Sequence, residues 1–168
     1  ITQVAASAGY EVLMVDIKQE FVDRGMATIQ KSLSKLVAKE RMSQFDADET
    51  IARITTTTNR NDCADVDLVV EAVPEILDLK TSIFSELDEI CKPECILASN
   101  TSSISISTIA NATSRPDKVI GMHFMNPVPI MKLVEIINGD QTSEATNFAV
   151  VEAAEKMGVT IQAVYGAI

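Results

Sequence analysis

The chain has 168 residues, of which 46% are hydrophobic, and this suffices for one domain with a packed core. Its 24 acidic residues outnumber 14 basic ones, so the net charge is −10 and nucleic acid and anionic membranes are poor general partners. No apolar run approaches the roughly 18 residues of a membrane span, and the N-terminus lacks a signal-peptide pattern. The sequence predicts a soluble protein.

The cysteines Cys63, Cys91 and Cys95 are an odd number in an ordinary globular composition. This favours buried thiols and a reducing compartment, such as the cytoplasm or the mitochondrial matrix, over a disulfide framework. Cys91 and Cys95 have a CxxxC spacing without a second pair, and the single histidine is far away in the sequence. We therefore expect no metal site.

The first part of the chain alternates between helical and strand patterns. A helix tail leads to a turn at Gly9, and a β-branched strand then ends at Asp16. A long amphipathic helix is expected over about 18–41, because apolar residues recur there at three- and four-residue spacing. These residues are Val22, Met26, Ile29, Leu33, Leu36 and Val37. A short acidic helix around "DADETIARI" and a strand "ITTTT" follow.

The same alternation continues to the end of the chain. "DLVVEAV" is a continuous apolar run, which is typical of a strand covered on both faces. After it come a helix over about 79–91, "CILAS", a helix near "ISTIA", the strands "KVIGM" and "KLVEII", a helix over about 143–156 and a strand-like terminus. The predicted fold class is α/β, a Rossmann-like, doubly wound and mostly parallel sheet.

Polar side chains follow four of the predicted strands, where open α/β sheets bind their ligands. They are Asp16, Glu75, Lys80, Asn100, Thr101, Ser102, Ser103 and His123. Asp16 lies where a dinucleotide fold places the carboxylate that binds the adenosine ribose, a position that favours NAD over NADP. Alternatively, Asp16 caps the next helix.

His123 is the only histidine, and its ordinary pKa suits the removal of a proton from an alcohol. A catalytic histidine needs a partner on its other nitrogen, and Glu135 is a candidate because its neighbours are apolar. Alternatively, His123 is a core histidine satisfied by the backbone, and Glu135 lies on a solvated face.

Two further patterns have both a binding and a structural interpretation. Ser102 could donate a hydrogen bond to a substrate oxygen, or it could cap the helix that follows. Lys31, Lys35 and Lys39 share one face of the long helix. That row could contact the phosphates of a nucleotide-bearing substrate, or it could simply be solvated.

Together, the segments "DLVVEAVPE", "ILASNTSSISIS" and "GMHFMNPVPIMKLVEII" resemble the NAD-binding domain of the 3-hydroxyacyl-CoA dehydrogenase family, which includes 3-hydroxybutyryl-CoA dehydrogenases. The resemblance extends from Ile1 to about Thr160. It implies that the protein oxidises the 3-hydroxyl group of an acyl-CoA to a ketone while NAD takes the hydride, in fatty-acid β-oxidation or butyrate-type metabolism.

The resemblance also implies roles for the matched residues. His123 would be the general base, Glu135 would orient it, and Ser102 would bind the substrate oxygen close to the nicotinamide. Residues assigned to the NAD site are Asp16, Glu75, Lys80 and Asn100. Residues assigned to the coenzyme A portion are Ser32 and Lys39.

The chain departs from the family pattern in several respects. It opens in a helical pattern, so we expect residues 1–168 to be a partial NAD-binding domain without its first strand and glycine-rich turn. The substrate-contacting segment after the domain and the helical C-terminal dimerisation domain are also expected to be absent. Met125 replaces an aromatic residue of many relatives. We expect this chain alone to be poorly folded and inactive, and the full-length protein to be a homodimer.

Two other interpretations stay open at this point. One is a non-enzymatic relative that binds NAD, such as the lens crystallins built on this scaffold. The other is a piece of a multifunctional β-oxidation protein that also carries an enoyl-CoA hydratase domain.

Overall fold

The computed structural model describes residues 1–164, and the chain divides into two compact units, the first over Ile1–Asp62 and the second from Cys63 onward. The last part of the strand-like terminus, residues 165–168, lies outside the described residues. None of the helices over 1–164 is long and apolar enough to cross a membrane.

The first unit contains three helices and a two-stranded parallel sheet, in which Val12 pairs with Ile54. Its elements are α1 (Thr2–Ser7), β1 (Val12–Val15), α2 (Gln19–Ala38), α3 (Gln44–Ala52) and β2 (Ile54–Thr57). The apolar stripe expected on the long helix is confirmed, because Ile29 and Leu33 of α2 form a buried cluster with Ala47 of α3.

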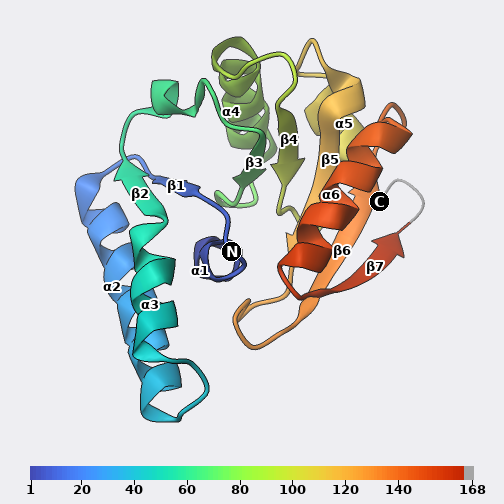
Figure 1. Cartoon of the computed structure of the whole chain (residues 1–168). Coiled ribbons are helices and arrows are strands. Elements are labelled where there is room, and N and C mark those ends of the chain that lie inside the picture. The colour runs from blue at the N-terminus through green and yellow to red at the C-terminus, as the bar shows by residue number, and fades with distance from the viewer. Residues whose placement is uncertain (165–168) are drawn as a thin grey trace. The chain divides into compact units, whose positions relative to one another are not determined.

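The second unit is built on a five-stranded sheet of order β3-β4-β5-β6-β7 (Figure 1). A 3₁₀ turn, η1 (Arg60–Cys63), connects the units. The elements are β3 (Leu68–Glu71), α4 (Leu77–Ile90), β4 (Ile96–Ser99), α5 (Ile106–Ala110), η2 (Pro116–Lys118), β5 (Val119–Phe124), β6 (Leu133–Asn138), α6 (Glu144–Lys156) and β7 (Thr160–Val164). All neighbouring strands are parallel except β5 and β6.

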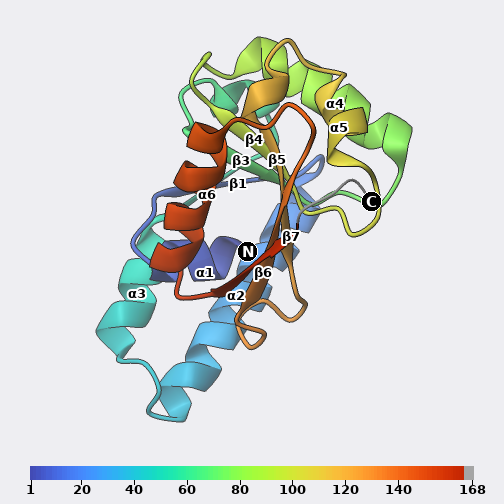
Figure 2. The same ribbon diagram turned by 90° about the vertical axis from the view of Figure 1, so that its right-hand side faces the viewer.

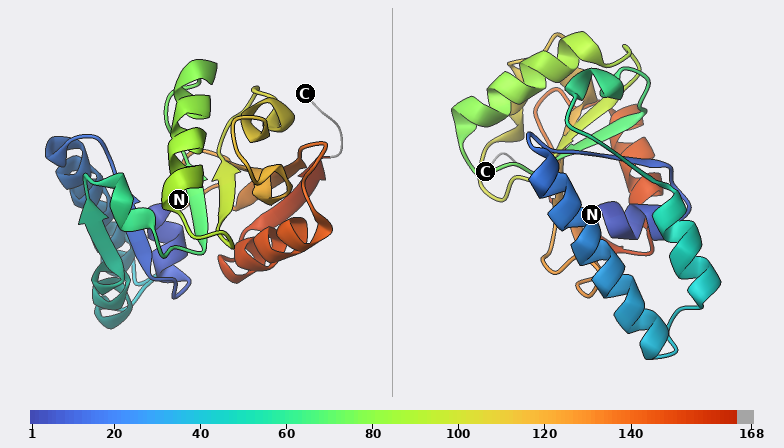
Figure 3. Two further views of the ribbon diagram at one scale, coloured as in Figure 1. Left: turned by 90° about the horizontal axis from the view of Figure 1, so that it is seen from above. Right: turned by 90° about the vertical axis from the view of Figure 1, so that its left-hand side faces the viewer.

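Helices cover both faces of this five-stranded sheet. In Figure 2 and in the left panel of Figure 3, α4 and α5 lie on one face and α6 on the other. The right panel of Figure 3 shows α2 and α3 of the first unit side by side. The central strands are accordingly buried, with Leu97 of β4, Ile120 of β5 and Val134 of β6 each 0% exposed. Burial on both faces explains why apolar residues dominate these strands. The run "DLVVEAV", for which the sequence predicted a strand covered on both faces, contains β3 at the edge of this sheet, and its residues 68–70 are only half-buried.

The α/β fold and the order of elements are as expected, with two differences in the arrangement of strands. The described strands form two sheets rather than one. In addition, β5 and β6 are antiparallel, because only the loop 125–132 connects them and a parallel pair needs a longer crossover.

The three cysteines are buried and form no disulfide with one another, as the composition indicated. Burial raises the pKa of the Cys91 thiol, and it raises the pKa of the Cys95 thiol to about 12. Both thiols therefore stay protonated near neutral pH and are poor nucleophiles.

Candidate active site

His123 and Glu135 form a hydrogen-bonded pair across two neighbouring strands. They are direct register partners in the antiparallel pair of β5 and β6, and His123 Nδ1 lies 2.8 Å from Glu135 Oε2. Their side chains are 21% and 28% exposed, so both are reachable from solvent. In the neutral tautomer that carries its proton on Nδ1, the ring donates a hydrogen bond to this carboxylate oxygen and has a free lone pair on Nε2.

The local sequence explains why these side chains face one another. Successive side chains of a strand point to opposite faces. His123 thus shares a face with Gly121, while the buried Met122 and Phe124 flank it along β5. Glu135 is flanked in the same way by the buried Val134 and Ile136. The sequence pattern placed His123 after the end of its strand, whereas His123 lies within β5, and Glu135 lies within β6.

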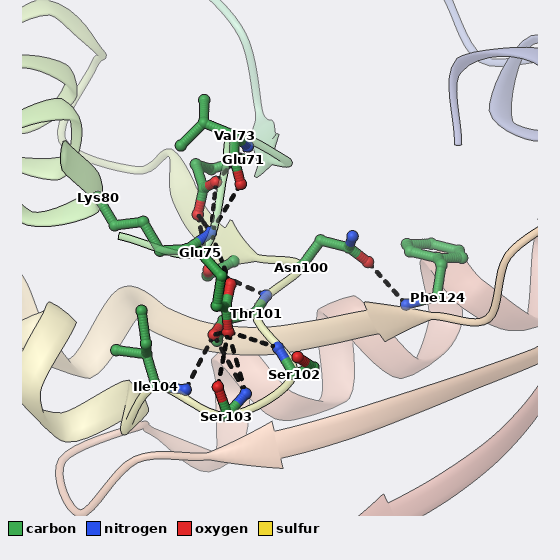
Figure 4. A network of polar contacts seen from close by, with 11 residues as sticks. Glu71, Val73, Glu75, Lys80, Asn100, Thr101, Ser102, Ser103, Ile104 and Phe124 are labelled. Atoms are coloured by element: carbon green, nitrogen blue, oxygen red, sulfur yellow. Dashed lines mark hydrogen bonds and ion pairs between the residues drawn. The ribbon is translucent and has the colours of Figure 1, made fainter. Parts of the chain in front are cut away.

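The carboxylate of Glu75 holds the turn that follows β4. Glu75 Oε1 accepts hydrogen bonds from the backbone amides of Ser102 and Ser103, at 3.0 and 3.1 Å (Figure 4). It also accepts from the hydroxyl groups of Ser103, at 3.2 Å, and of Thr101. The side chain of Glu75 thus binds three consecutive residues of the turn.

These contacts change the acidity of Glu75. Burial raises its pKa, but hydrogen bonds from Thr101, Ser103 and Ser102 outweigh burial. The positive charge of Lys80 acts in the same direction, and the pKa of Glu75 falls to about 2. Glu75 is therefore ionised at neutral pH and remains an acceptor for the turn.

Beneath Glu75 lies a buried ion pair between Glu71, at the end of β3, and Lys80, in the first turns of α4. Lys80 Nζ is 2.8 Å from Glu71 Oε1, and the two residues are 1% and 4% exposed. Sequence reasoning missed Glu71 because it lies in the apolar run "LVVEAV". A charged residue in such a run, with a lysine one turn into the next helix, is the signal that could have found it.

Asn100 ties the same turn to the strand that carries His123. Its side-chain oxygen Oδ1 accepts a hydrogen bond from the backbone amide of Phe124, at 2.8 Å (Figure 4). Since Phe124 directly follows His123, this hydrogen bond joins the turn after β4 to the pair of His123 and Glu135, here called the dyad. This leaves the amide nitrogen of Asn100 as a donor for a ligand.

Ser102 is exposed, and its hydroxyl group makes no hydrogen bond to the part of the chain described in the structure. The capping alternative is wrong for this residue. Helix α5 is capped by Ser105, whose side chain accepts from the amide of Thr108. The hydroxyl of Ser102 is thus available to a ligand.

The other candidate residues belong to the first unit. Asp16 directly follows β1, and its carboxylate accepts a hydrogen bond from the amide of Ile17, at 2.7 Å. Asp16 is not a helix cap, because the N-cap of α2 is Lys18. Ser32 is half-buried on α2, and Lys39 is exposed at its end. Lys31 and Lys35 are exposed as well.

A mostly parallel sheet with helices on both faces and a polar cluster past β3 and β4 defines a Rossmann-like α/β domain. The sequence profile of the NAD-binding domain of 3-hydroxyacyl-CoA dehydrogenases matches residues 1–165. The chain belongs to this family.

Known proteins similar to the chain agree with this assignment. The chain is 55% identical over 161 residues to a probable 3-hydroxybutyryl-CoA dehydrogenase of Deinococcus radiodurans, covering 95% of the chain and 57% of the relative. It is 44% identical over 158 residues to the alpha subunit of a fatty acid oxidation complex of Psychrobacter arcticus, covering 94% of the chain and 22% of the relative.

A solved structure is similar over nearly the whole chain. The crystal structure of (S)-3-hydroxybutyryl-CoA dehydrogenase from Ralstonia eutropha superimposes with a TM-score of 0.96 at 44% identity, covering 98% of this chain and 58% of that one. The chain spans about half the length of the 3-hydroxybutyryl-CoA dehydrogenases it matches.

Proposed function

We propose that the protein carrying this chain oxidises the 3-hydroxyl group of a 3-hydroxyacyl-CoA to the 3-keto group, reversibly and with NAD. The observation that carries the proposal is the hydrogen bond between His123 and Glu135. A free, exposed hydroxyl at Ser102 and the names of the similar proteins support it.

In this reaction, His123 Nε2 accepts the proton of the substrate hydroxyl. Glu135 keeps the other ring nitrogen protonated beforehand and stabilises the imidazolium that forms. The Ser102 hydroxyl donates a hydrogen bond to the substrate oxygen and so holds this oxygen close to His123. NAD supplies the acceptor for the hydride that leaves the substrate carbon. Proton transfer of this kind contributes about 10²–10⁴-fold to the rate.

The residues of the chain suit a dinucleotide. The carboxylate of Asp16, which accepts a hydrogen bond from the adjacent amide of Ile17, is available to the hydroxyls of the adenosine ribose. We assign Glu75, Lys80 and Asn100 to the NAD site in the second unit. Lys80 contributes its positive charge rather than exposed surface, since it is 1% exposed.

The remaining assignments concern the substrate and the whole protein. Ser32 and Lys39 of α2 are proposed to contact the coenzyme A portion, with the lysine charge facing phosphate. The full-length protein is proposed to be a homodimer with a helical C-terminal domain, in the cytoplasm or the mitochondrial matrix. Similarity to a fatty acid oxidation complex subunit favours β-oxidation as a second setting for the same reaction.

The test is acetoacetyl-CoA-dependent oxidation of NADH by the full-length protein and by its His123→Gln variant. The variant is expected to lose at least about 10²-fold in kcat, while its affinity for NADH stays the same. NADH binding without turnover in the unsubstituted protein would show a dehydrogenase scaffold with a different function.

A further inference from the structure

The buried pair of Glu71 and Lys80 makes contacts that stability alone does not explain. Glu71 Oε1 accepts from Lys80 Nζ at 2.8 Å and from the amide of Val73 at 2.6 Å. Glu71 Oε2 accepts from Lys80 Nζ at 3.0 Å and from Ser99 Oγ at 2.7 Å. Two apolar side chains of similar volume would often stabilise a core as well as a buried ion pair does. The pair therefore suggests a role in placing other groups.

One set of contacts runs from Glu71 through Ser99 to the turn after β4. Ser99 Oγ donates to Glu71 and accepts a hydrogen bond from the backbone amide of Thr101, at 3.2 Å. Ser99 is 0% exposed and Thr101 is 3% exposed, so this connection is shielded from water. A buried hydrogen bond of this kind restricts the start of the turn.

A second set of contacts runs through Lys80 and Glu75 to the same turn. Lys80 Nζ is held by Glu71 and by the carbonyl oxygen of Val73, and lies 3.4 Å from Glu75 Oε2. The other oxygen of Glu75 accepts from the amides of Ser102 and Ser103. Figure 4 shows both oxygens of Glu75 between the lysine and the turn.

We propose that Glu71 is a positioning residue for the Ser102 hydroxyl. It does not touch the substrate; it fixes the Thr101 amide through Ser99 and the Ser102 and Ser103 amides through Lys80 and Glu75. Asn100 anchors the same turn to β5, so Glu71 also sets the place of Ser102 relative to His123. The inference rests on the proposed function for its effect on catalysis, since a misplacement of about 1 Å costs about 10²-fold in rate.

The experiment compares Glu71→Gln with Asp88→Asn in the full-length protein. Asp88 is a matched control: it pairs with Arg115 at 2.6 Å, both side chains are 11% exposed, and its carboxylate accepts hydrogen bonds from Ser114 and Arg115 rather than from the Ser102 turn. The measurements are kcat, KM, amide hydrogen exchange at Ser102 and Ser103, and kcat of each variant combined with Ser102→Ala. Ser99→Ala is a second test variant, since it removes one connection without leaving a buried charge unpaired.

For Glu71→Gln we expect a loss of about 10²-fold in kcat, a small change in KM and faster exchange of both amides. In the Ser102→Ala background the same change should cost little, because the group it positions is gone. Asp88→Asn should lower the unfolding midpoint but leave kcat and both amides unchanged. Ser99→Ala should follow Glu71→Gln with a smaller loss.

Two results would overturn the inference. One is a double variant in which the losses of kcat from Glu71→Gln and Ser102→Ala simply add. The other is amide exchange at Ser102 and Ser103 in Glu71→Gln that is no faster than in Asp88→Asn. Should Glu71→Gln fail to fold, Ser99→Ala decides by the same two criteria. An unsubstituted protein that turns over no 3-hydroxyacyl-CoA refutes the proposed function instead. In that case the exchange comparison alone decides whether Glu71 holds the turn.

Discussion

His123 and Glu135 are direct cross-strand partners in the antiparallel pair of β5 and β6, with 2.8 Å between Nδ1 and Oε2. The backbone register, rather than a flexible loop, therefore sets the geometry of the dyad. A slip of one residue between the two strands would turn Glu135 to the opposite face of the sheet. The dyad is thus only as well defined as the register of these strands.

Replacing Glu135 by glutamine should impair turnover more than binding. The amide is close in size, but it has no charge to stabilise the imidazolium. Its nitrogen can also donate a hydrogen bond to Nδ1, which favours the tautomer with the proton on Nε2, where the substrate proton has to be accepted. We expect kcat of the full-length protein to fall about 10²–10⁴-fold with little change in KM. Glu152→Gln, on the exposed side of α6, is the control and should keep full activity. A Glu135→Gln variant as active as this control would refute the role of Glu135.

Much of the fold could be predicted because periodicity follows directly from burial. The stripe on α2 marks its packing against α3, and the predicted strands "CILAS" and "KVIGM" correspond to β4 and β5, whose residues 97–98 and 119–122 are buried. The antiparallel pairing of β5 and β6 was missed, although the short loop between them allows no parallel crossover. Whether two strands pair in parallel or antiparallel depends on the length of the connection between them and not on the residues of the strands themselves.

Part of the candidate site could be predicted for a similar reason. His123 and Glu135 are conspicuous because they are polar residues among apolar neighbours. Glu71 is equally polar among apolar neighbours, yet its significance depends on Lys80 and Ser99, which only the packing of α4 and β4 brings to it. Networks that join three elements leave no fixed spacing in the sequence.

Gly121 should be sensitive to substitution because it lies opposite Ile137 in the register that aligns the dyad. A Cβ at Gly121 would lie 2.9 Å from Ile137 Cβ and 3.0 Å from Ile106 Cδ1, closer than side chains tolerate. We expect Gly121→Ala to destabilise the protein by about 1–3 kcal/mol and to lower kcat by displacing His123.

Gly25→Ala is the matched control for Gly121→Ala. Gly25 lies inside α2, and its added Cβ would meet only the flexible end of Met14, with Cε at 3.2 Å. Alanine is favoured over glycine in a helix by about 1 kcal/mol. This variant should therefore be as stable as the unsubstituted protein or more so. Thermal unfolding of the two variants gives the comparison, and equal effects would contradict the crowding argument.

Glu75 should make stability depend on pH in the acid range. The pKa of Glu75 in the folded protein is about 2, below its ordinary value of 4.5. The stabilisation by its carboxylate is therefore fully present above about pH 4.5 and is lost as the pH falls towards 2. Glu75→Gln should lower the unfolding midpoint at neutral pH, and the difference from the unsubstituted protein should shrink as the pH falls.

Unfolding midpoints measured from about pH 7 down to about pH 2.5 check this prediction. The pKa of Asp88 is lowered as well, since hydrogen bonds from Ser114 and Arg115 outweigh burial. Asp88 is present in both proteins, so the difference between them isolates Glu75. A difference that stays constant over this range would show that the ionised form of Glu75 is not what stabilises the turn.

Glu40 occupies a backbone conformation that favours glycine. Its φ is 55°, its amide donates to the carbonyl of Val37, and the next amide, of Arg41, donates to the carbonyl of Leu36. This pair of bonds is the Schellman motif that closes the C-terminus of α2. Helix α6 ends in the same way with Gly158, at a φ of 69°. The two helices thus differ in the residue at the left-handed position.

Exchanging these residue types should shift stability in opposite directions. Glu40→Gly removes a left-handed side-chain cost of about 1–2 kcal/mol and adds flexibility to the unfolded chain worth about 0.4–1 kcal/mol. We expect a net gain of about 0.5–1 kcal/mol, which follows from these two terms. Gly158→Ala imposes the same conformational cost and should lose about as much. Urea unfolding of both variants measures the two shifts, and a loss of stability in Glu40→Gly would mean that the Glu40 side chain contributes a contact that outweighs its backbone strain.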